Sequence, residues 1–156
     1  MEEAVIGVDP GAKGAYCILV PGTNQIYFVD ANLPPLTIHE LLQYYRDHFS
    51  IQHIRLEDVH SIYGMSAKSN FNFGSNVREA YLQLLFADFQ TDTVRVTPKI
   101  WQKTVGVTAK GKLIKQDVAG LCQSLYPNCP IFGPRGGLMD GRSDSLMIAH
   151  YAHLTR

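Results

Sequence analysis

Ala4-Val5-Ile6-Gly7-Val8-Asp9-Pro10-Gly11 lies near the start of this 156-residue chain and predicts its first structural element. A mostly apolar run leads to Asp9, and the Pro-Gly dipeptide behind it is typical of a turn. We therefore expect a buried β-strand that carries a carboxylate at its C-terminal end. An aspartate before Pro-Gly also has a purely structural interpretation as a turn former, and this alternative stays open at this point.

Similar strand-like runs return along the chain and alternate with segments of helical spacing. The expected strands cover residues 4–9, 14–20, 25–30, 53–57 and 93–97. The expected helices include 75–89, a short helix from Pro98 that carries Trp101, a helix from about Ile114, and 140–154. Hairpins supply antiparallel strand pairs, and helical crossovers supply parallel ones. The order predicts an α/β fold with a five-stranded mixed sheet flanked by helices.

The composition narrows the class of protein. The chain is 46% apolar and carries 14 basic and 14 acidic side chains, which suits a single domain over residues 1–156. This composition excludes a disordered tail and a fibrous repeat. No apolar run approaches the roughly 18–20 residues of a membrane span, and the N-terminus is acidic, unlike a secretory signal. Three cysteines without C-x-x-C spacing indicate reduced thiols, so we expect a cytoplasmic protein without a membrane partner.

The zero net charge hides an uneven distribution. Residues 1–58 carry eight acidic and three basic side chains, whereas residues 59–156 carry six acidic and eleven basic ones. Between residues 95 and 115 there is no acid, and the bases are Arg95, Lys99, Lys103, Lys110, Lys112 and Lys115. Such a basic tract can follow the phosphate backbone of a nucleic acid. The alternative is an ordinary solvated surface, and the tract alone does not decide between the two.

The predicted fold would bring four carboxylates close together. Asp9 and Glu57 end the first and fourth strands, and they lie side by side if these strands are parallel neighbours. Asp140 and Asp144 are four residues apart and share one helical face. Because close carboxylates repel one another, divalent cations with oxygen ligands are the usual resolution. A pair of such ions can promote the hydrolysis of a phosphodiester.

Each of these acids also has an ordinary explanation. Asp140 and Asp144 could simply favour a helix N-terminus, where acids suit the helix dipole. Asp58 follows Glu57 directly and competes with it for the inward position, although strand alternation favours Glu57. The four acids in this order are harder to explain separately than together.

Nucleotide-binding patterns are incomplete in this chain. Residues 106–112 match the start of a phosphate-binding loop, but Leu113 follows where a Ser or Thr would hold magnesium. The actin-like ATPases and sugar kinases also open with Asp and Gly after a first strand, but they need two such lobes, for which 156 residues leave no room. We therefore expect no nucleotide cofactor.

Short motifs from about residue 4 to residue 153 resemble one family. They are Ile6-Gly7-Val8-Asp9-Pro10-Gly11 with Gly14-Ala15, Leu56-Glu57-Asp58-Val59, Asn70-Phe71-Asn72-Phe73-Gly74-Ser75, Val96-Thr97-Pro98, Trp101-Gln102-Lys103, Lys110-Gly111-Lys112 with Lys115, Leu125-Tyr126-Pro127, and Asp140-Gly141-Arg142-Ser143-Asp144. Together they look like the RuvC-like Holliday junction resolvases, and in particular the phage-type branch. Several motifs in register make this resemblance specific.

The resemblance implies a ribonuclease H-like fold and a homodimer with two active sites, each holding two magnesium or manganese ions. The implied activity is the paired nicking of four-way DNA junctions in recombination and repair. Asp9, Glu57 and Asp144 match the family's metal-binding acids. The remaining acid or histidine of the bacterial members stands three residues before the final Asp, where this chain has Gly141. Our hypothesis is that Asp140 substitutes for it.

Basic and aromatic residues are expected to contact the branched DNA. Lys115, at the start of its helix, is the lysine expected nearest the scissile phosphate. The loop 58–70 and the residues after it would present aromatics to the junction centre, although Phe71 and Phe73 could equally pack beneath the following helix. The full expected set is Tyr63, Lys68, Phe71, Phe73, Lys99, Lys103, Lys110, Lys112, Lys115 and Arg142.

The helix 75–89 also carries the expected dimer face. Leu82 and Phe86 are assigned to its core stripe, and Tyr81 and Leu84 to a second apolar side that a partner would cover.

Two functional alternatives stay open beside the resolvase. One is a relaxed nuclease for branches, flaps or replication forks, and the other is a non-catalytic DNA-binding module on the same fold, which the presence of all four acids disfavours.

Overall fold

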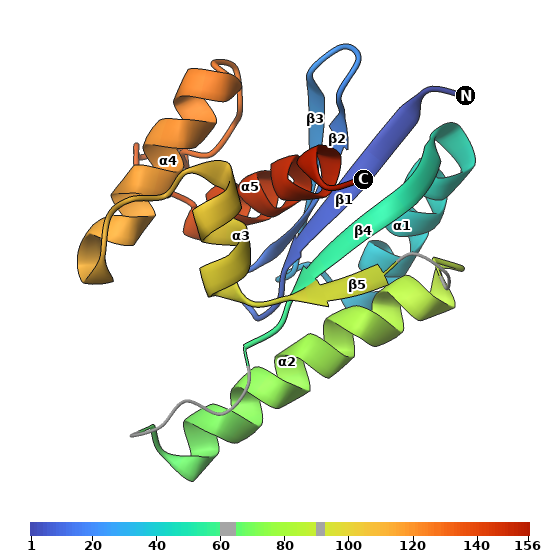
Figure 1. The fold of residues 1–156 in the computed structure, drawn as a ribbon. Helices are drawn as coiled ribbons and strands as arrows, with labels where there is room; N and C mark the ends of the chain where they lie inside the picture. The colour runs from blue at the N-terminus through green and yellow to red at the C-terminus, as the bar shows by residue number, and fades with distance from the viewer. Residues whose placement is uncertain (60–64, 90–92) are drawn as a thin grey trace.

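The computed structural model describes residues 1–59, 65–89 and 93–156 and shows a mixed sheet flanked by helices (Figure 1). The strands are β1 (Glu3–Asp9), β2 (Ala15–Val20), β3 (Gln25–Asp30), β4 (Ser50–Glu57) and β5 (Thr93–Val96). The helices are α1 (Pro35–His48), α2 (Ala67–Phe86), α3 (Pro98–Val105), α4 (Ile114–Leu125) and α5 (Asp140–Leu154), with a 3-10 turn at Gly111–Leu113. Within the described ranges, none of the helices is both long enough and apolar enough to cross a membrane.

The sheet has the strand order β3-β2-β1-β4-β5, which confirms the predicted five-stranded mixed sheet. Its central strand β1 pairs antiparallel with β2 and parallel with β4. The hairpin partner β3 extends the antiparallel half, and β5 extends the parallel half. Because β1, β4 and β5 run in the same direction, their C-terminal ends share one edge of the sheet.

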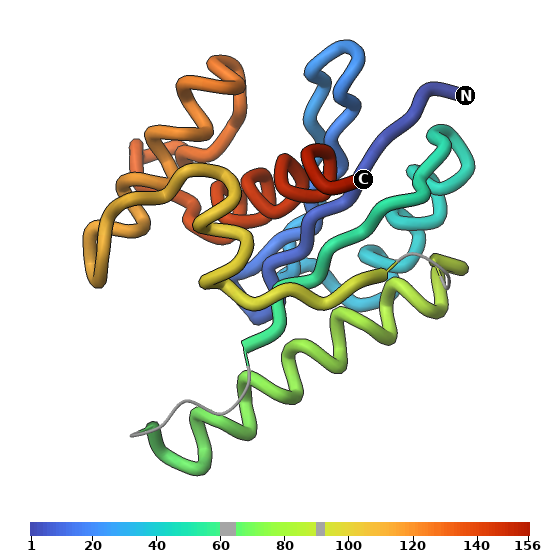
Figure 2. The backbone as a smooth tube through the Cα atoms, in the orientation of Figure 1, coloured from blue at the N-terminus to red at the C-terminus, as the bar shows by residue number. Residues whose placement is uncertain are grey.

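Alternation along β1 divides the apolar core into two layers. Ala4, Ile6 and Val8 belong to the layer covered by α1 and α2. Val5 belongs to the layer covered by α3, α4 and α5. In Figure 2 the α5 trace crosses one face of the sheet, and the α1 trace lies behind it. Both faces of the central strands are therefore buried, as the continuous apolar run 4–8 indicates.

Helix α5 approaches β1 closely at Gly7. A Cβ at this position would collide with backbone atoms of Ser145 and Ala149 in α5. A larger residue would therefore push the helix away from the sheet. This close packing fixes the distance of α5 from β1, and with it the position of the acids at the start of α5.

Helix α2 begins at Ala67, eight residues earlier than predicted. Ser66 caps it, because its Oγ accepts a 3.1 Å hydrogen bond from the Ser69 backbone N–H. The expected loop up to Asn70 is therefore wrong. Asn70, Asn72 and Gly74 are weak helix formers, and their local preference is overridden here by the cap and the helix that follows.

The buried face of α2 also differs from the prediction. Val77, Ala80 and Leu84 face the core, whereas Phe86 is 66% exposed. The predicted assignment of Leu84 to an outer face and Phe86 to the core stripe is therefore wrong. Both stripes have helical spacing, and the smaller Val-Ala-Leu stripe is the one that fits against the sheet.

Candidate active site

The edge of the sheet where β1 and β4 end brings Asp9 and Glu57 together. Val8 pairs with Leu56 across the two parallel strands, so the next residue of each strand emerges at the same level. A hydrogen bond joins the two carboxyl groups. Burial, followed by the charges of neighbouring carboxylates, raises the pKa of Asp9 to about 9. Burial also raises the pKa of Glu57, so the pair retains a proton at neutral pH.

Glu57, rather than its neighbour Asp58, is the carboxylate that shares a hydrogen bond with Asp9. Both side chains are 8% exposed, so burial alone does not distinguish them. The Asp58 backbone N–H donates a 2.8 Å hydrogen bond to the Val96 carbonyl, which continues the sheet beyond β4. Glu57, the member that strand alternation favoured, is therefore the one that lies next to Asp9, and its role in the reaction stays a prediction.

Trp101 holds Glu57 in place, and the sequence reasoning assigned it no functional role. It is fully buried in α3, and its Nε1–H donates a 2.7 Å hydrogen bond to Glu57 Oε2. This bond stabilises the ionised carboxylate and counteracts part of the rise that burial causes in its pKa. A buried tryptophan needs a partner for its N–H group, but the sequence predicted only a short helix that carries Trp101 and did not indicate its burial.

The first turns of α5 supply the other two acids. Burial, with the charges of Glu57 and Asp140, raises the pKa of Asp144 to about 7. Asp140 Oδ2 accepts an ion-pair hydrogen bond from Lys115 Nζ at 2.7 Å, and this bond raises the pKa of Lys115. Because the charges of Asp140, Asp144 and Glu57 all raise the pKa of Asp9, the structure brings all four predicted acids within electrostatic reach of one another.

The backbone at Gly141 explains why this chain carries its acid four residues before Asp144. A Cβ on Gly141 would collide with the carbonyl oxygen of Lys13 and crowd Gly14. Position 141 therefore accommodates no side chain, while Asp140 stands at the start of α5 with its carboxylate free to turn toward Lys115. This packing supports Asp140 as the substitute on steric grounds, and its role in the reaction stays a prediction.

The donor chemistry of this edge fits a hard divalent cation. Four carboxylates supply oxygen ligands, and burial, followed by repulsion from neighbouring carboxylates, raises the pKa values of Asp9 and Asp144. As the side chains stand, no three His, Cys, Asp or Glu side chains within residues 1–59, 65–89 and 93–156 form a group that could hold one ion. Asp140 is turned to Lys115, so it would have to rotate to become a ligand. The two magnesium or manganese ions stay a prediction.

The basic tract is exposed along its length. Lys99 and Lys103 lie on α3, Lys110 and Lys112 lie at the 3-10 turn, and Lys115 lies in the first turn of α4. Among them, Lys115 makes the ion pair with a candidate acid. The exposure of the other lysines is compatible with the predicted phosphate contacts.

Arg142 has a structural role that the sequence did not indicate. Its guanidinium donates hydrogen bonds of 2.9 and 2.7 Å to the two carboxylate oxygens of Asp30, and a 3.0 Å hydrogen bond to the Pro130 carbonyl. It also lies 5.1 Å from the ring centroid of Phe28. These contacts tie the start of α5 to the end of β3, so we leave Arg142 out of the proposed DNA surface.

The aromatic residues expected in a loop lie instead on α2. Phe71 is 73% exposed near the start of this helix, and Lys68 is exposed one turn before it. Phe73 is partly buried on the same helix. Neither phenylalanine packs beneath the following helix, because both belong to the helix itself. Tyr63 lies outside the described residues.

Strand order and acid placement together define the type of fold. A mixed sheet in the order β3-β2-β1-β4-β5, with acids at the ends of β1 and β4 and a third at the start of a helix packed on β1, is a ribonuclease H-like arrangement. In open α/β sheets, functional sites form at the carboxyl ends of the strands, and these acids lie there.

Comparison with solved structures shows which members of this class the chain resembles. Thermus thermophilus RuvC bound to a Holliday junction substrate has a TM-score of 0.60 at 16% identity, over 95% of this chain and 91% of that chain. Thermus thermophilus RuvC in a second structure has a TM-score of 0.58 at 16% identity, over 97% of this chain and 96% of that chain. The yeast mitochondrial Holliday junction resolvase Ydc2 has a TM-score of 0.49 at 16% identity, over 96% of this chain and 77% of that chain.

These likenesses confirm the RuvC-like fold that the motifs indicated. No family model and no curated protein sequence matches the chain. At 16% identity the likeness establishes the fold, and the phage-type branch stays a prediction.

Proposed function

We propose that this chain is a structure-specific DNA endonuclease that resolves four-way junctions by hydrolysing phosphodiester bonds. The observation that carries the proposal is the meeting of Asp9, Glu57, Asp140 and Asp144 at one sheet edge, beside Lys115. A fold alone does not define a reaction, so the proposal rests on this site. The structural likeness to a RuvC bound to a Holliday junction supports branched DNA as the substrate class.

Each residue at this edge of the sheet would have a different role in the reaction. Asp9 lies at the centre, since it bonds to Glu57 and is within electrostatic reach of both acids of α5, so it would share any cation with them. Trp101 keeps Glu57 in one orientation through its hydrogen bond. When bound, divalent cations would supply positive charge against the scissile phosphate and lower the pKa of water.

Lys115 would position the strand that is cut. Its side chain is 67% exposed, so its ammonium group can reach a phosphate oxygen without leaving the site. In the protein without DNA, Asp140 holds this group at 2.7 Å. When a phosphate binds Lys115, the Asp140 carboxylate is free to turn toward the other acids. DNA binding would therefore complete the group of four carboxylates.

The exposed lysines and Phe71 would hold the rest of the junction. Lys110 and Lys112 offer salt-sensitive phosphate contacts, which position DNA without reading its sequence. Phe71 projects from α2 with 73% of its surface exposed, and an exposed aromatic can stack on a base at the open centre of a junction.

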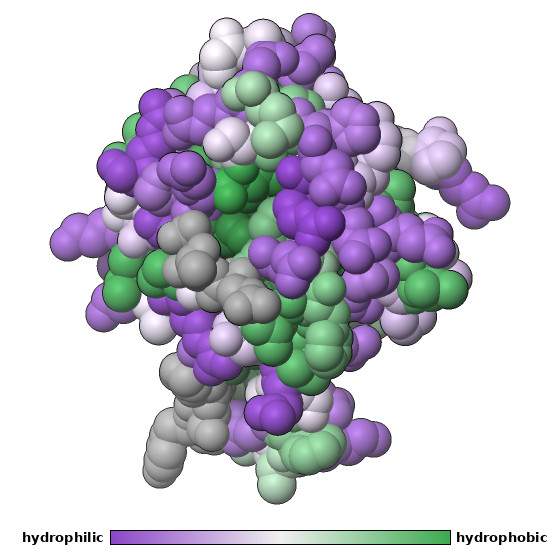
Figure 3. All heavy atoms as spheres, turned by 90° about the vertical axis from the view of Figure 1, so that its right-hand side faces the viewer, coloured by the Kyte–Doolittle hydropathy of each residue, from purple (hydrophilic) through white to green (hydrophobic). Residues whose placement is uncertain are grey.

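A second copy of the chain would cover the exposed apolar face of α1 and α2. Leu36 and Phe86 are 67% and 66% exposed, and with Leu82 they line an open groove of about 650 Å³ between the two helices. Figure 3 shows hydrophobic side chains gathered among hydrophilic ones on the side of the molecule that includes α1. A four-way junction has two equivalent strands to cut, so a two-fold pair with one site each fits it. A Phe86→Asp variant should sediment as a monomer if this face forms the dimer.

The experiment that tests the function is incubation of the protein with labelled four-way, three-way and duplex DNA, with and without magnesium. We expect symmetric paired nicks in the four-way substrate that require magnesium and are lost in Asp9→Asn. Asp47→Asn is the matched control, because Asp47 is an exposed aspartate of α1. Equal cutting of four-way and three-way junctions would favour the relaxed nuclease. Tight junction binding without any cutting would favour the non-catalytic module.

A further inference from the structure

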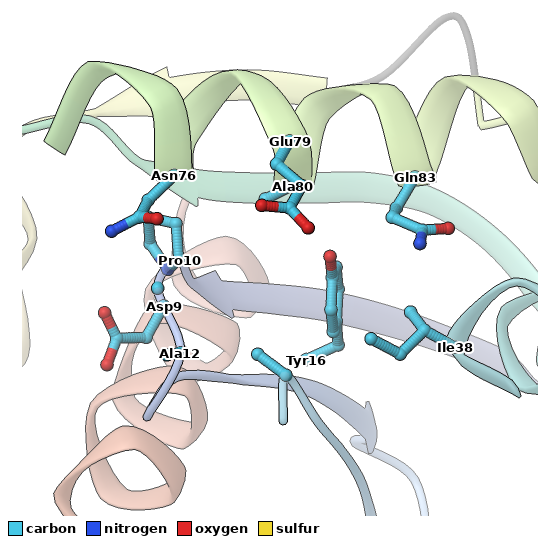
Figure 4. Close-up of a pocket in the computed structure, with 11 residues that line it drawn as sticks. Asp9, Pro10, Ala12, Tyr16, Ile38, Asn76, Glu79, Ala80 and Gln83 are labelled. Carbon is cyan, nitrogen blue, oxygen red and sulfur yellow. The ribbon is translucent and has the colours of Figure 1, made fainter. Parts of the chain in front are cut away.

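The two faces of the sheet differ in charge beside Asp9. On the face covered by α2, Asn76, Glu79 and Gln83 line a pocket of about 170 Å³ (Figure 4). The described residues of its lining include the acids Asp9 and Glu79 and no lysine or arginine, so this pocket does not attract a phosphate backbone. The basic tract lies on α3, on α4 and between them, in the layer on the other face. The path of a bound DNA backbone therefore depends on how that tract is held.

The loop 107–113 between α3 and α4 carries two of the lysines, Lys110 and Lys112. Val107 at its start and Ile114 behind it pack against the core, whereas both lysines between them are exposed. A loop with so few apolar contacts can adopt many conformations, and each would place the lysines differently. The loop therefore needs a further contact if its lysines are to meet phosphates at fixed positions.

Asp117, in the first turn of α4, provides this contact. Its Oδ2 accepts a 2.8 Å hydrogen bond from the Thr108 backbone N–H and a 2.9 Å hydrogen bond from the Ala109 backbone N–H. The Thr108 side chain also hydrogen-bonds to this carboxylate. The backbone bonds from Ala109 and Thr108 lower the pKa of Asp117, so the carboxylate is ionised at neutral pH and the bonds are charge-assisted. Asp117 thereby ties α4 to the two residues directly before Lys110.

The Asp117 carboxylate stands close to the loop lysines in the chain without pairing with them. It is the first acid after the acid-free tract 95–115. Among residues 1–59, 65–89 and 93–156, no salt bridge joins Asp117, Lys110 or Lys112 to another side chain. An acid that neutralised the tract would face an ammonium group, whereas this one faces backbone N–H groups. Both ammonium groups therefore stay available to phosphates.

We propose that Asp117 is a positioning residue for DNA binding, which fixes the backbone at residues 108–109 so that Lys110 and Lys112 meet the phosphates of the junction. Asp117 itself makes no contact with the DNA. This inference rests on the proposed function, because it assumes that the loop lysines bind branched DNA. It adds to that function an acidic residue on which the affinity depends.

The charge of Asp117 and its hydrogen bonds predict opposite effects on DNA binding. If Asp117 acted only through its charge, it would repel the phosphates, and its removal would strengthen binding. If it acts by holding the loop, its removal releases the backbone, and each phosphate contact then costs more conformational entropy. Binding would weaken in that case, although the protein has lost a negative charge. The sign of the change therefore separates the two roles.

The first experiment measures the affinity for a labelled four-way junction by fluorescence anisotropy, in chelator so that no strand is cut. We expect Asp117→Ala to bind about 5- to 10-fold more weakly than the wild type. The slope of log affinity against log salt should fall by about one to two, as for the loss of one or two phosphate contacts. Asp117→Asn keeps an oxygen that accepts both backbone N–H groups, so it should bind within about twofold of the wild type. Glu40→Ala, which removes an exposed acid of α1, is the matched control and should change neither quantity.

A double-mutant cycle distinguishes positioning from a general loss of structure. If Asp117 acts through the loop lysines, Asp117→Ala should weaken binding by less than about twofold once Lys110 and Lys112 are both replaced by alanine. In a Lys99→Ala background the full loss should persist, because Lys99 lies on α3 and outside the loop. A variant that merely loosened the fold would lose affinity equally in both backgrounds.

Amide hydrogen exchange followed by NMR reports on the loop itself. The Thr108 and Ala109 amides should exchange at least about tenfold faster in Asp117→Ala than in the wild type, whereas the amide of the buried Cys122 in α4 should not change. Unchanged or stronger junction binding by Asp117→Ala, or equal losses in the two lysine backgrounds, would overturn the inference. If the wild type binds junctions but cuts no branched DNA with magnesium, the positioning role stands and the nuclease function fails. If it binds no DNA, both fail.

Discussion

Helices α5 and α2 both border the candidate site, but they are held in opposite ways. α5 touches β1 through the backbone at Gly7, and Gly141 at its start touches the backbone of Lys13. α2 presents Val77, Ala80 and Leu84 to the core and leaves Phe71 and Phe86 largely exposed. One helix therefore packs directly against the backbone of the sheet, and the other keeps an open surface.

The two helices would therefore have different roles, α5 in the reaction and α2 in the recognition of DNA and of a second protein copy. The acids of α5 must stay at fixed distances from Asp9, and backbone contact without intervening side chains provides such rigidity. α2 carries the exposed Phe71, which would meet DNA bases, and one side of the apolar groove, which would meet a second protein copy. Substitutions on α5 should therefore disturb both stability and cutting, whereas substitutions on α2 should change which DNA is bound or cut.

The largest expected effect comes from adding a methyl group under α5. Gly7→Ala would place a Cβ against the backbone of Ser145 and Ala149, so we expect a loss of about 3 kcal/mol or more in the free energy of unfolding, and loss of cutting. The same change on α2, Gly74→Ala, meets open space and should stabilise the protein by up to about 1 kcal/mol. Chemical denaturation of both variants measures this contrast, and equal stabilities would contradict it.

The next effect concerns the bond that orients Glu57. Trp101→Phe keeps an aromatic ring in the core but removes the 2.7 Å hydrogen bond, so we expect cutting to slow about 10- to 100-fold. Without this donor the pKa of Glu57 should rise further, and the pH profile of cutting should shift to higher pH. Val105→Ala, another buried change in α3, is the control for stability alone and should leave the pH profile in place.

A moderate effect follows from the raised pKa values of Asp9 and Asp144, about 9 and about 7 in the folded protein. Both exceed the value of about 3.9 in an unfolded chain, so the folded state binds more protons at neutral pH. The stability contributed by the protonated groups is present at low pH and is lost as pH rises through about 7 and about 9.

Thermal denaturation in chelator should therefore show the melting temperature falling from pH 5 to pH 9, by less in Asp144→Asn than in the wild type. Magnesium should reduce the fall, because a cation stabilises the ionised carboxylates. The difference between the two slopes reports the Asp144 carboxylate together with its effect on the pKa of Asp9. Identical slopes for the two proteins would contradict the raised pKa of Asp144.

The smallest expected effect tests the open surface of α2. Phe71→Ala should change the free energy of unfolding by less than about 0.5 kcal/mol, because the side chain is 73% exposed. It should weaken binding to a four-way junction about 5- to 10-fold while leaving duplex binding unchanged, since each stacked base contributes about 1–3 kcal/mol. Leu154→Ala, at an exposed apolar position at the end of α5, is the matched control and should alter neither affinity.

The two strands and the helix that carry the carboxylates could be predicted, because the sequence patterns that define them are local. The apolar run that ends at Asp9, the strand that ends at Glu57 and the helix from Asp140 to Leu154 have the predicted ends. The start of α2 could not be predicted in this way. The Asn- and Gly-containing stretch before residue 75 is locally weak, and the Ser66 cap and the helix behind it decide its conformation.

Local patterns predicted the α/β class, the order of the elements and the four candidate acids, because strand alternation, helical spacing and turn residues act over a few positions. Which side chains contact these acids depends on contacts between residues far apart in the chain. In the folded protein Trp101 donates a hydrogen bond to Glu57, Arg142 donates to Asp30, and position 141 has no room for an acidic side chain. The tertiary structure also decided which apolar stripe of α2 is buried, because two stripes of equal spacing differ only in how well they fit the sheet.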